Sequence, residues 1–183
     1  FPGNDVCFVK PNTVEEVEVG EEGEICISGP TIMEGYLNNE EENKETLQLH
    51  EDGKIWLHTG DLGKVDENGI IYYVQRLKRM IISSGFNVYP SQIEKVLRSD
   101  SRVESCVVVG QPHPYKVEVP VAYIVLKPDV KKDSKLKKEL KALCVKNLAR
   151  HSIPYKFEFK EELPKTLMGK IDFKSLQKKK GSK

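Results

Sequence analysis

A lysine that directly follows a glycine near the chain's end is the first candidate for a chemical role. Lys170 lies in "LPKTLMGKI", residues 163–171, where the proline and the glycine predict a turn or loop. A lysine on such a loop presents a compact charge with three donors, which suits phosphate or carboxylate oxygens. The glycine beside it leaves room for a ligand to approach. Taken alone, such a stretch more often contains an ordinary solvated lysine, because the chain holds 29 Lys+Arg.

The composition predicts a folded globular protein with a modest core. A length of 183 residues is enough for one large domain or two small ones, and 38% of the residues are hydrophobic and 31% charged. The formal net charge of +1 argues against a nucleic-acid partner, since it gives no broad positive field. The basic run at residues 178–180 is expected to be part of a frayed, solvated tail, residues 178–183.

The metal-binding residue types show no ligand spacing along the chain. No C-x-x-C pair occurs, so we expect neither a metal site nor a disulfide framework, and buried thiols in a reducing cytoplasm are the default interpretation. No apolar run reaches the length of a membrane span, and the first residues contain no signal peptide. They suggest a fragment of a longer protein. The residues concerned are Cys7, Cys26, Cys106, Cys144, His50, His58, His113 and His151.

Residues 1–76 are rich in short β-type runs bounded by Gly, Pro, Asn and Asp, which predicts a sheet of short strands. We expect a hairpin turn at residues 66–69, where "DENG" contains an Asn-Gly pair, and one helix at residues 40–49. Together these pieces favour a small barrel or a curled sheet. The expected strands are "DVCFV", "EEVEV", "GEICIS", "KIWLHTG" and "IIYYV".

Residues 79–177 combine strands with two helical stretches, which predicts a small α+β domain whose sheet is covered by helices. "RMIIS" and "FNVYP" are expected to form a hairpin, and the mostly apolar "VPVAYIVL" a central strand. "ESCVVVG" and "YKFEFKEEL" are further strands. An amphipathic helix is expected over "SKLKKELKALCVKNLAR". Its inward positions are Leu136, Leu140, Leu143 and Leu148.

The other expected helix, "SQIEKVLRS", has a capping box at its start. Ser91 is the expected N-cap and Glu94 lies three residues later. Upstream, "QRLKRM", residues 75–80, places polar and basic residues between two apolar runs. That segment is either an ordinary loop or a hinge between two rigid bodies.

Four stretches together resemble the C-terminal part of the adenylate-forming superfamily of acyl-CoA synthetases, peptide-synthetase adenylation domains and luciferases. The resemblance covers nearly the whole chain. It implies that residues 1–76 are the last β-rich subdomain of a large N-terminal domain, 77–79 a hinge, and 80–177 a small mobile domain. The four stretches are "GEICISGPTIMEGYLN", "HTGDLG", "QRLKRMIISSGFNVYPSQIE" and "LPKTLMGKI".

Two site residues that the resemblance implies are a nucleotide-binding pair. Asp61, in "TGD", matches the aspartate that accepts hydrogen bonds from the ribose hydroxyls, as a carboxylate can. Arg76 matches an arginine that contacts the ribose or phosphate. Taken without the resemblance, Asp61 is equally an Asx-turn carboxylate and Arg76 a surface ion-pair partner. Lys78 matches the hinge position, although a plain loop lysine stays open.

The resemblance also assigns roles to Gly85 and Lys170. Gly85 matches a glycine whose backbone approaches the pantetheine arm, while a hairpin needs a glycine there as well. Lys170 matches the lysine that contacts the carboxylate and the α-phosphate during adenylation. Glu94 receives no catalytic role, because the capping box explains it. The sequence departs from the family's usual pattern at Phe173, where an arginine is common, and at Val117, where a glycine is common.

The activity implied is ATP-dependent ligation of a carboxylic acid, such as a fatty acid, to coenzyme A through an acyl-adenylate. ATP or AMP, coenzyme A and Mg2+ are the implied cofactors, with Mg2+ bound mainly by an N-terminal domain that this sequence lacks. The fragment alone is therefore expected to be inactive, and a cytoplasmic location is expected, with peripheral membrane association left open. A peptide-synthetase adenylation domain and a non-catalytic binding module are the alternatives. Luciferase chemistry is a remote third.

Overall fold

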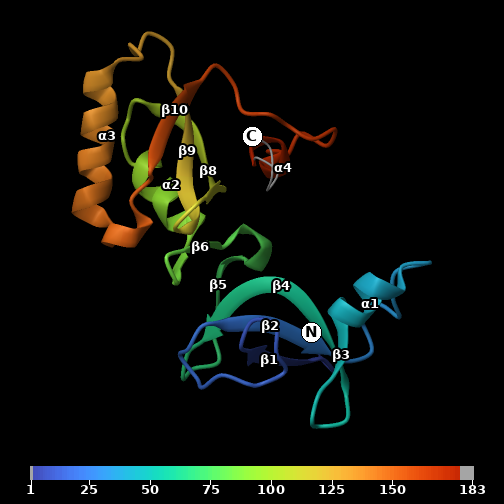
Figure 1. Cartoon of the computed structure of the whole chain (residues 1–183). Helices are drawn as coiled ribbons and strands as arrows, with labels where there is room; N and C mark the ends of the chain where they lie inside the picture. The colour runs from blue at the N-terminus through green and yellow to red at the C-terminus, as the bar shows by residue number, and fades with distance from the viewer. Residues whose placement is uncertain (1, 178–183) are drawn as a thin grey trace. The chain divides into compact units, whose positions relative to one another are not determined.

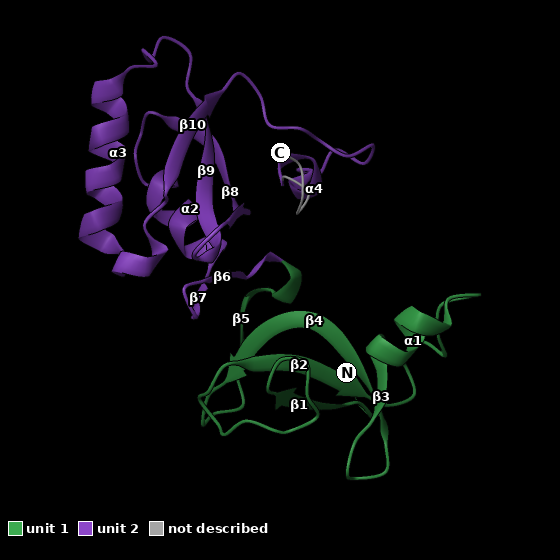
Figure 2. Cartoon of the chain, viewed as in Figure 1, with its two compact units in different colours: residues 1–78 green, residues 79–183 purple. Residues whose placement is uncertain are grey.

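The computed structural model describes residues 2–177 and divides the chain into two compact units, residues 1–78 and 79–183 (Figure 2). The predicted α+β class is confirmed. The division falls inside the segment that the sequence suggests as a hinge, whose motion stays a prediction. The expected basic tail lies outside the described residues. Among residues 2–177, no helix combines the length and apolar character that a membrane crossing needs.

Unit 1 is a five-stranded antiparallel sheet built around one long, curved strand, β4 (Figure 1). β4 pairs with β3 at its start, with β2 along its middle and with β5 at its end. The turn between β4 and β5 is the predicted one, since the amide of Asp66 donates to the carbonyl of Ile70. The strands are β1 (Asp5–Val9), β2 (Gly23–Ser28), β3 (Leu47–Leu49), β4 (Ile55–Val65) and β5 (Ile71–Arg76).

Two predictions for unit 1 are wrong in their extent. The helix α1 (Glu40–Thr46) begins after the N-cap Asn39 and ends three residues early, because Leu47–Leu49 pairs with β4 instead. The run "EEVEV" forms only an isolated bridge between Glu16 and Val9. Alternation predicts an extended backbone, but a strand also needs a partner along its length.

Unit 2 places β9 (Val117–Leu126) at the centre of a second five-stranded sheet, as the sequence predicts. β9 pairs antiparallel with β8 (Val103–His113) and parallel with β10 (Lys156–Lys160). It also meets the hairpin of β6 (Ile81–Ser83) and β7 (Phe86–Val88). Because successive side chains of a strand point to opposite faces, β9 contributes to a core on each side.

Helices cover one face of this sheet and the C-terminal segment covers the other (Figure 1). α2 (Pro90–Arg98) and α3 (Ser134–Asn147) pack on Ala122, Ile124 and Leu126 of β9. On the opposite face, Leu163 and the short helix α4 (Phe173–Leu176) pack with the core of Val107, Val109, Val121, Tyr123 and Val125. Two 3-10 turns remain. Leu77–Arg79 spans the division between the units, and Arg150–Ser152 lies between α3 and β10.

The inward face of α3 is largely the predicted one. Leu136 and Leu140 are buried, and Leu148 packs against the core just after the helix ends. Cys144 is fully buried, while the neighbouring Leu143 is only half-buried. The difference is one helical position, about 100° of rotation, which a pattern of leucines alone cannot specify.

The predicted capping box at α2 is wrong. The N-cap lies two residues earlier, at Tyr89, with Pro90 in the first turn, so Ser91 lies inside the helix. Glu94 points into the unit instead. Its Oε1 accepts from the backbone amide of Val108 at 2.9 Å and pairs with the guanidinium of Arg79. A buried amide and a half-buried cation, both distant from Glu94 in sequence, thus bind the carboxylate.

Candidate functional site

Asp61 and Arg76 lie opposite each other in the β4–β5 pair. Arg76 Nε lies 2.9 Å from Asp61 Oδ1, and Arg76 Nη1 donates to the carbonyl of Thr59 at 3.1 Å. The Asp61 side chain is 27% exposed and that of Arg76 60%, so both can still reach solvent. The structure therefore brings together the two residues to which the sequence assigns a nucleotide.

The backbone that carries Asp61 is shaped by a glycine inside a strand. Gly60 has a φ of +70°, which a residue with a side chain adopts only under strain. Thr59 Oγ1 donates to the carbonyl of Ile25 at 2.7 Å and accepts from the amide of Asp61 at 3.1 Å. These bonds hold against β2 the irregular segment of β4 that we call the Thr59–Asp61 loop.

A buried chain of polar side chains supports the same loop. Glu24 Oε1 accepts from the amide of Gly60 at 2.9 Å, and Glu24 Oε2 lies 3.0 Å from Nδ1 of His58. His58 Nε2 in turn lies 3.0 Å from Nε2 of His50. All three side chains are buried. The sequence alone did not predict this group, although Glu24 lies in the stretch "GEICISGPTIMEGYLN" and His58 in "HTGDLG".

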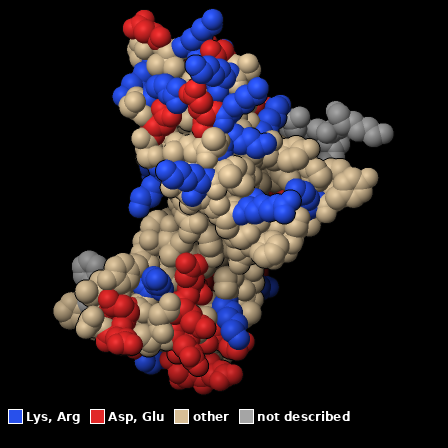
Figure 3. Space-filling view, turned by 90° about the vertical axis from the view of Figure 1, so that its left-hand side faces the viewer, with Lys and Arg blue, Asp and Glu red and all other residues tan. Residues whose placement is uncertain are grey.

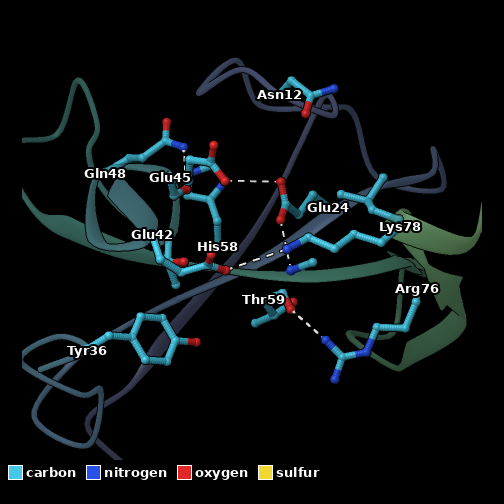
Figure 4. Close-up of a pocket in the computed structure, with 13 residues that line it drawn as sticks. Asn12, Glu24, Tyr36, Glu42, Glu45, Gln48, His58, Thr59, Arg76 and Lys78 are labelled. Atoms are coloured by element: carbon cyan, nitrogen blue, oxygen red, sulfur yellow. Dashed lines mark hydrogen bonds and ion pairs between the residues drawn. The ribbon is translucent and has the colours of Figure 1, made fainter. Parts of the chain in front are cut away.

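A cavity of about 450 Å³ opens beside this loop (Figure 4). Glu24, His58 and Arg76 contribute to its wall, and Asp61 does not. Lys78 also lines it, with Nζ 3.5 Å from Oε1 of Glu42. The wall combines carboxylate acceptors with two cationic donors. It can therefore bind a ligand that carries both hydroxyl and anionic groups.

Gly85 occupies the tip of the β6–β7 hairpin. Ser84 and Gly85 have φ values of +52° and +82°, as a two-residue turn with the twist of its strands requires. The Ser84 amide donates to the carbonyl of Lys116 at 3.0 Å. A Cβ placed on Gly85 would have no atom within 4 Å, so only the turn needs a glycine within unit 2.

A second cavity, of about 350 Å³, lies beside that hairpin. Phe86 stacks on His151 with ring centroids 4.6 Å apart and an angle of 4° between planes. Lys116 and Arg150 add positive charge to the wall, and the Lys116 ammonium lies 5.9 Å from the ring centroid of Tyr155. Aromatic faces beside cations are suited to a planar, negatively charged ligand.

Lys170 lies on a tight turn, as the sequence predicts. The Thr166 amide donates to the carbonyl of Lys170 at 2.7 Å, and the Gly169 amide donates to that of Thr166 at 2.9 Å. Gly169 has a φ of +77°. The side chains of Leu167 and Met168 at the tip are exposed.

The base of this turn is anchored by apolar contacts. Leu163 is buried, and Ile171 packs against the same core. Phe173 lies nearby in the chain and packs under Arg79, whose guanidinium carbon is 4.1 Å from the ring centroid. The aromatic ring thus takes part in packing within unit 2 at the position where a second basic residue is common in the family.

Comparison with known proteins shows that this chain is similar to parts of CoA ligases. Residues 92–170 match the family model described as the AMP-binding enzyme C-terminal domain. The chain is 39% identical to the long-chain-fatty-acid–CoA ligase of Bacillus subtilis over 171 residues. This alignment covers 93% of this chain and 29% of that protein. The chain is 40% identical to the 2-succinylbenzoate–CoA ligase of Listeria monocytogenes over 90% of this chain and 33% of the relative.

Solved structures give the same result. An ATP-bound RpMatB-BxBclM chimera has a TM-score of 0.86 at 35% identity, over 96% of this chain and 34% of that one. The o-succinylbenzoate CoA synthetase of Bacillus subtilis, in complex with its acyl-adenylate intermediate, has a TM-score of 0.81 at 33% identity, over 100% and 35%. The chain thus spans about a third of the length of the proteins it matches.

Proposed function

We propose that the chain is the C-terminal part of an AMP-forming acyl-CoA ligase, since residues 92–170 match the AMP-binding enzyme C-terminal domain model. The complete enzyme would activate a carboxylic acid with ATP as an acyl-adenylate and pass the acyl group to coenzyme A. The similarity to two CoA ligases supports this reaction over that of a peptide synthetase. A fatty acid is the proposed class of acid, after the first of these relatives.

The presentation of Lys170 is the observation that carries the proposal. Its turn is closed by backbone hydrogen bonds and anchored by Leu163, while the side chain itself is exposed. Within residues 2–177, no carboxylate lies within ion-pair distance of its ammonium. A lysine whose backbone is held in a turn and whose ammonium is exposed can bind an anion from outside the unit. A preorganised charge of this kind stabilises a transition state best.

In this mechanism Lys170 acts in the first half-reaction. Negative charge develops at the α-phosphate as the carboxylate attacks and pyrophosphate leaves. A lysine aimed at that position stabilises the transition state more than the ground state. The second half-reaction, thiol attack on the adenylate, does not place the same charge there. Lys170 should therefore matter for adenylation and little for thioester formation.

Asp61 and Arg76 are the proposed nucleotide contacts. Asp61 keeps an exposed fraction of 27%, and a carboxylate offers two acceptor oxygens to a pair of ribose hydroxyls. Arg76 holds Asp61 by an ion pair and keeps further donors for a ribose or phosphate oxygen. The Thr59 carbonyl bond fixes the orientation of the guanidinium.

Lys78 is the proposed hinge residue. It is the last residue of unit 1 and lies in the 3-10 turn Leu77–Arg79. Its ion pair with Glu42 joins two side chains that are 84% and 40% exposed, so breaking this pair costs about 1 kcal/mol at most. A change of φ and ψ here meets little resistance from side-chain contacts.

Gly85 is the proposed contact for the pantetheine arm of coenzyme A. The glycine exposes its backbone at a hairpin tip, and the aromatic and basic cavity beside it provides a place for a planar anionic group. A large side chain at Gly85 would occupy the approach and meet no atom of unit 2 at its Cβ, while its positive φ would strain the hairpin turn.

Mg2+ is assigned to the part of the protein upstream of this chain. Within the described part of the chain, the group of three possible metal ligands consists of nitrogen and sulfur atoms, whereas Mg2+ prefers oxygen. A cytoplasmic location completes the proposal, supported by the four cysteines, which the structure shows as free buried thiols.

The test separates the two half-reactions in the full-length protein. Lys170→Ala should slow single-turnover adenylation by about 10²–10³ and leave thioester formation from a supplied acyl-adenylate nearly unchanged. Gly85→Trp should have the opposite effect. Lys170→Arg should not restore adenylation, because a planar guanidinium does not replace an ammonium on a tight turn.

Lys165→Ala is the matched control, since Lys165 lies across the same turn and pairs with Ile171 through its backbone. It should leave both half-reactions intact. Equal losses in both half-reactions for Lys170→Ala and Gly85→Trp would reject the assigned roles. Full adenylation activity of Lys170→Ala would reject the role of Lys170, and a full-length wild type without ligase activity would favour the non-catalytic alternative.

A further inference from the structure

Three possible metal ligands converge on one buried point of unit 1. Cys26 Sγ and one ring nitrogen each from His50 and His58 all lie within 4.8 Å of one another. We propose that Cys26, His50 and His58 bind a divalent transition-metal ion, Zn2+, which braces the loop that carries Asp61. The site lies beside the proposed chemistry and takes no part in it.

The strand register brings two of the ligands together. Cys26 on β2 is the direct partner of His58 on β4, so both side chains project from the same face of the sheet. His50 follows β3, in the turn whose Gly53 amide donates back to its carbonyl at 3.0 Å. Trp56 stacks on the His50 ring at a centroid distance of 5.4 Å and holds it toward the sheet.

The spacing of the ring nitrogens is close to what a metal needs. His50 Nε2 and His58 Nε2 are 3.0 Å apart. Tetrahedral zinc, with Zn–N bonds of about 2.0–2.1 Å, places two such nitrogens about 3.3–3.4 Å apart. An opening of a few tenths of an ångström therefore converts the hydrogen bond into a pair of ligands. Imidazole and thiolate together favour zinc over oxygen-seeking ions.

Glu24 supplies the outer contact that such sites usually have. Its Oε2 lies 3.0 Å from Nδ1 of His58, so the ring can donate there and present Nε2 to the metal. Its Oε1 accepts from the amide of Gly60. The ion would thus be linked through one carboxylate to the Thr59–Asp61 loop.

The protons can be balanced without a further reactant. A neutral His50 ring that carries its proton on Nδ1 leaves Nε2 free to bind the metal. Because a metal binds the thiolate, the Cys26 thiol must lose its proton to solvent as the metal binds. The cavity lined by His58 and Glu24 offers space for a water as the fourth ligand.

The experiment uses the 183-residue chain, stripped of metal by a chelator, and titrates it with Zn2+ by calorimetry and with Co2+ by absorption. We expect one ion per chain and a thiolate-to-cobalt charge-transfer band. Cys26→Ser should remove the band, His50→Gln should weaken binding at least tenfold, and Glu24→Gln should weaken it about 10–100-fold. Cys144→Ser and His113→Gln, outside unit 1, are the matched controls and should bind as the wild type does.

Absence of stoichiometric binding, or binding that survives in both Cys26→Ser and His50→Gln, would overturn the proposal. If either variant does not fold, the wild-type cobalt spectrum decides: a missing charge-transfer band rejects the site, and a band that Cys144→Ser retains supports it. Neither a nucleotide nor coenzyme A is present in the assay, so a negative result would leave the proposed ligase function unaffected.

Discussion

The two units bury their apolar side chains to very different extents. Among the described residues, one core of unit 2 joins 14 buried side chains from the sheet, α2 and α3, and a second lies on the sheet's other face. The core cluster of unit 1 consists of Cys7, Val9, Cys26 and Trp56. Several apolar side chains of unit 1 are exposed instead. They include Leu37, Leu49, Ile55, Ile70, Ile71, Tyr72 and Tyr73.

The units also differ in charge. Residues 1–78 hold 6 Lys+Arg and 17 Asp+Glu, whereas residues 79–183 hold 23 and 11, so their formal net charges are −11 and +12. Figure 3 shows acidic side chains gathered on the unit 1 part and basic ones on the unit 2 part. The near-neutral total hides this contrast. The larger apolar core of unit 2 indicates that this unit carries its own stability.

The largest expected effect is in the unit 2 core. Leu140→Ala should cost about 2–5 kcal/mol of unfolding free energy, because Leu140 is fully buried between α3 and the sheet. Far-UV circular dichroism should report it, since α2 and α3 lie in unit 2. The single tryptophan, Trp56, reports on unit 1 and should melt as before. Leu49→Ala, at a side chain 68% exposed, is the control with little effect. A parallel shift of both signals would mean that the units unfold together.

Glu94→Ala should be the next most damaging change. It leaves Arg79 without its carboxylate partner and the Val108 amide without an acceptor, a loss of about 3 kcal/mol. Chemical denaturation followed by circular dichroism measures it. Glu104→Ala, on the exposed side of β8, should change stability by a few tenths of a kcal/mol at most. Similar losses for both would argue that Glu94 acts through net charge alone.

A pH-dependent effect is expected at Asp100. Hydrogen bonds from Arg102 hold the pKa of this carboxyl below its usual value. Its contribution is therefore present above the unfolded pKa, about 3.9, and disappears as pH falls through the lower native value. Asp100→Asn should lose about 1 kcal/mol at neutral pH and less in acid. Glu162→Gln, at an exposed residue, should show no such trend. A pH-independent loss would contradict the linkage.

The smallest effect has the opposite sign. Val117 has a φ of +64°, which strains a β-branched residue. Val117→Gly should raise the stability of unit 2 by about 0.5–1 kcal/mol, because relief of about 1–2 kcal/mol exceeds the added entropy of the unfolded chain. Val145→Gly, at a similarly exposed position inside α3, should lower it. Thermal melts of both variants give the comparison, and destabilisation by both would refute the strain.

The sequence determined those features whose information is local. The alternation of β9, the amphipathic face of α3 and the turns at Gly69, Gly85 and Gly169 each depend on neighbouring residues, and the structure reproduces them. The motifs also led to the family. The roles of Asp61, Arg76, Lys78, Gly85 and Lys170 stay predictions, although the strand register does bring Asp61 and Arg76 together.

Only the tertiary structure decided the features that depend on distant partners. By its local sequence Glu94 matches a capping box. Only the packing of β8 and Arg79 against α2 brings the Val108 amide and the Arg79 guanidinium to its carboxylate. Cys26, His50 and His58 show no metal-ligand spacing in the sequence. The register of β2 and β4 brings Cys26 and His58 together, and the turn after β3 adds His50. Periodicity and spacing report a residue's near neighbours, whereas a buried polar group is satisfied by whichever atoms the fold places around it.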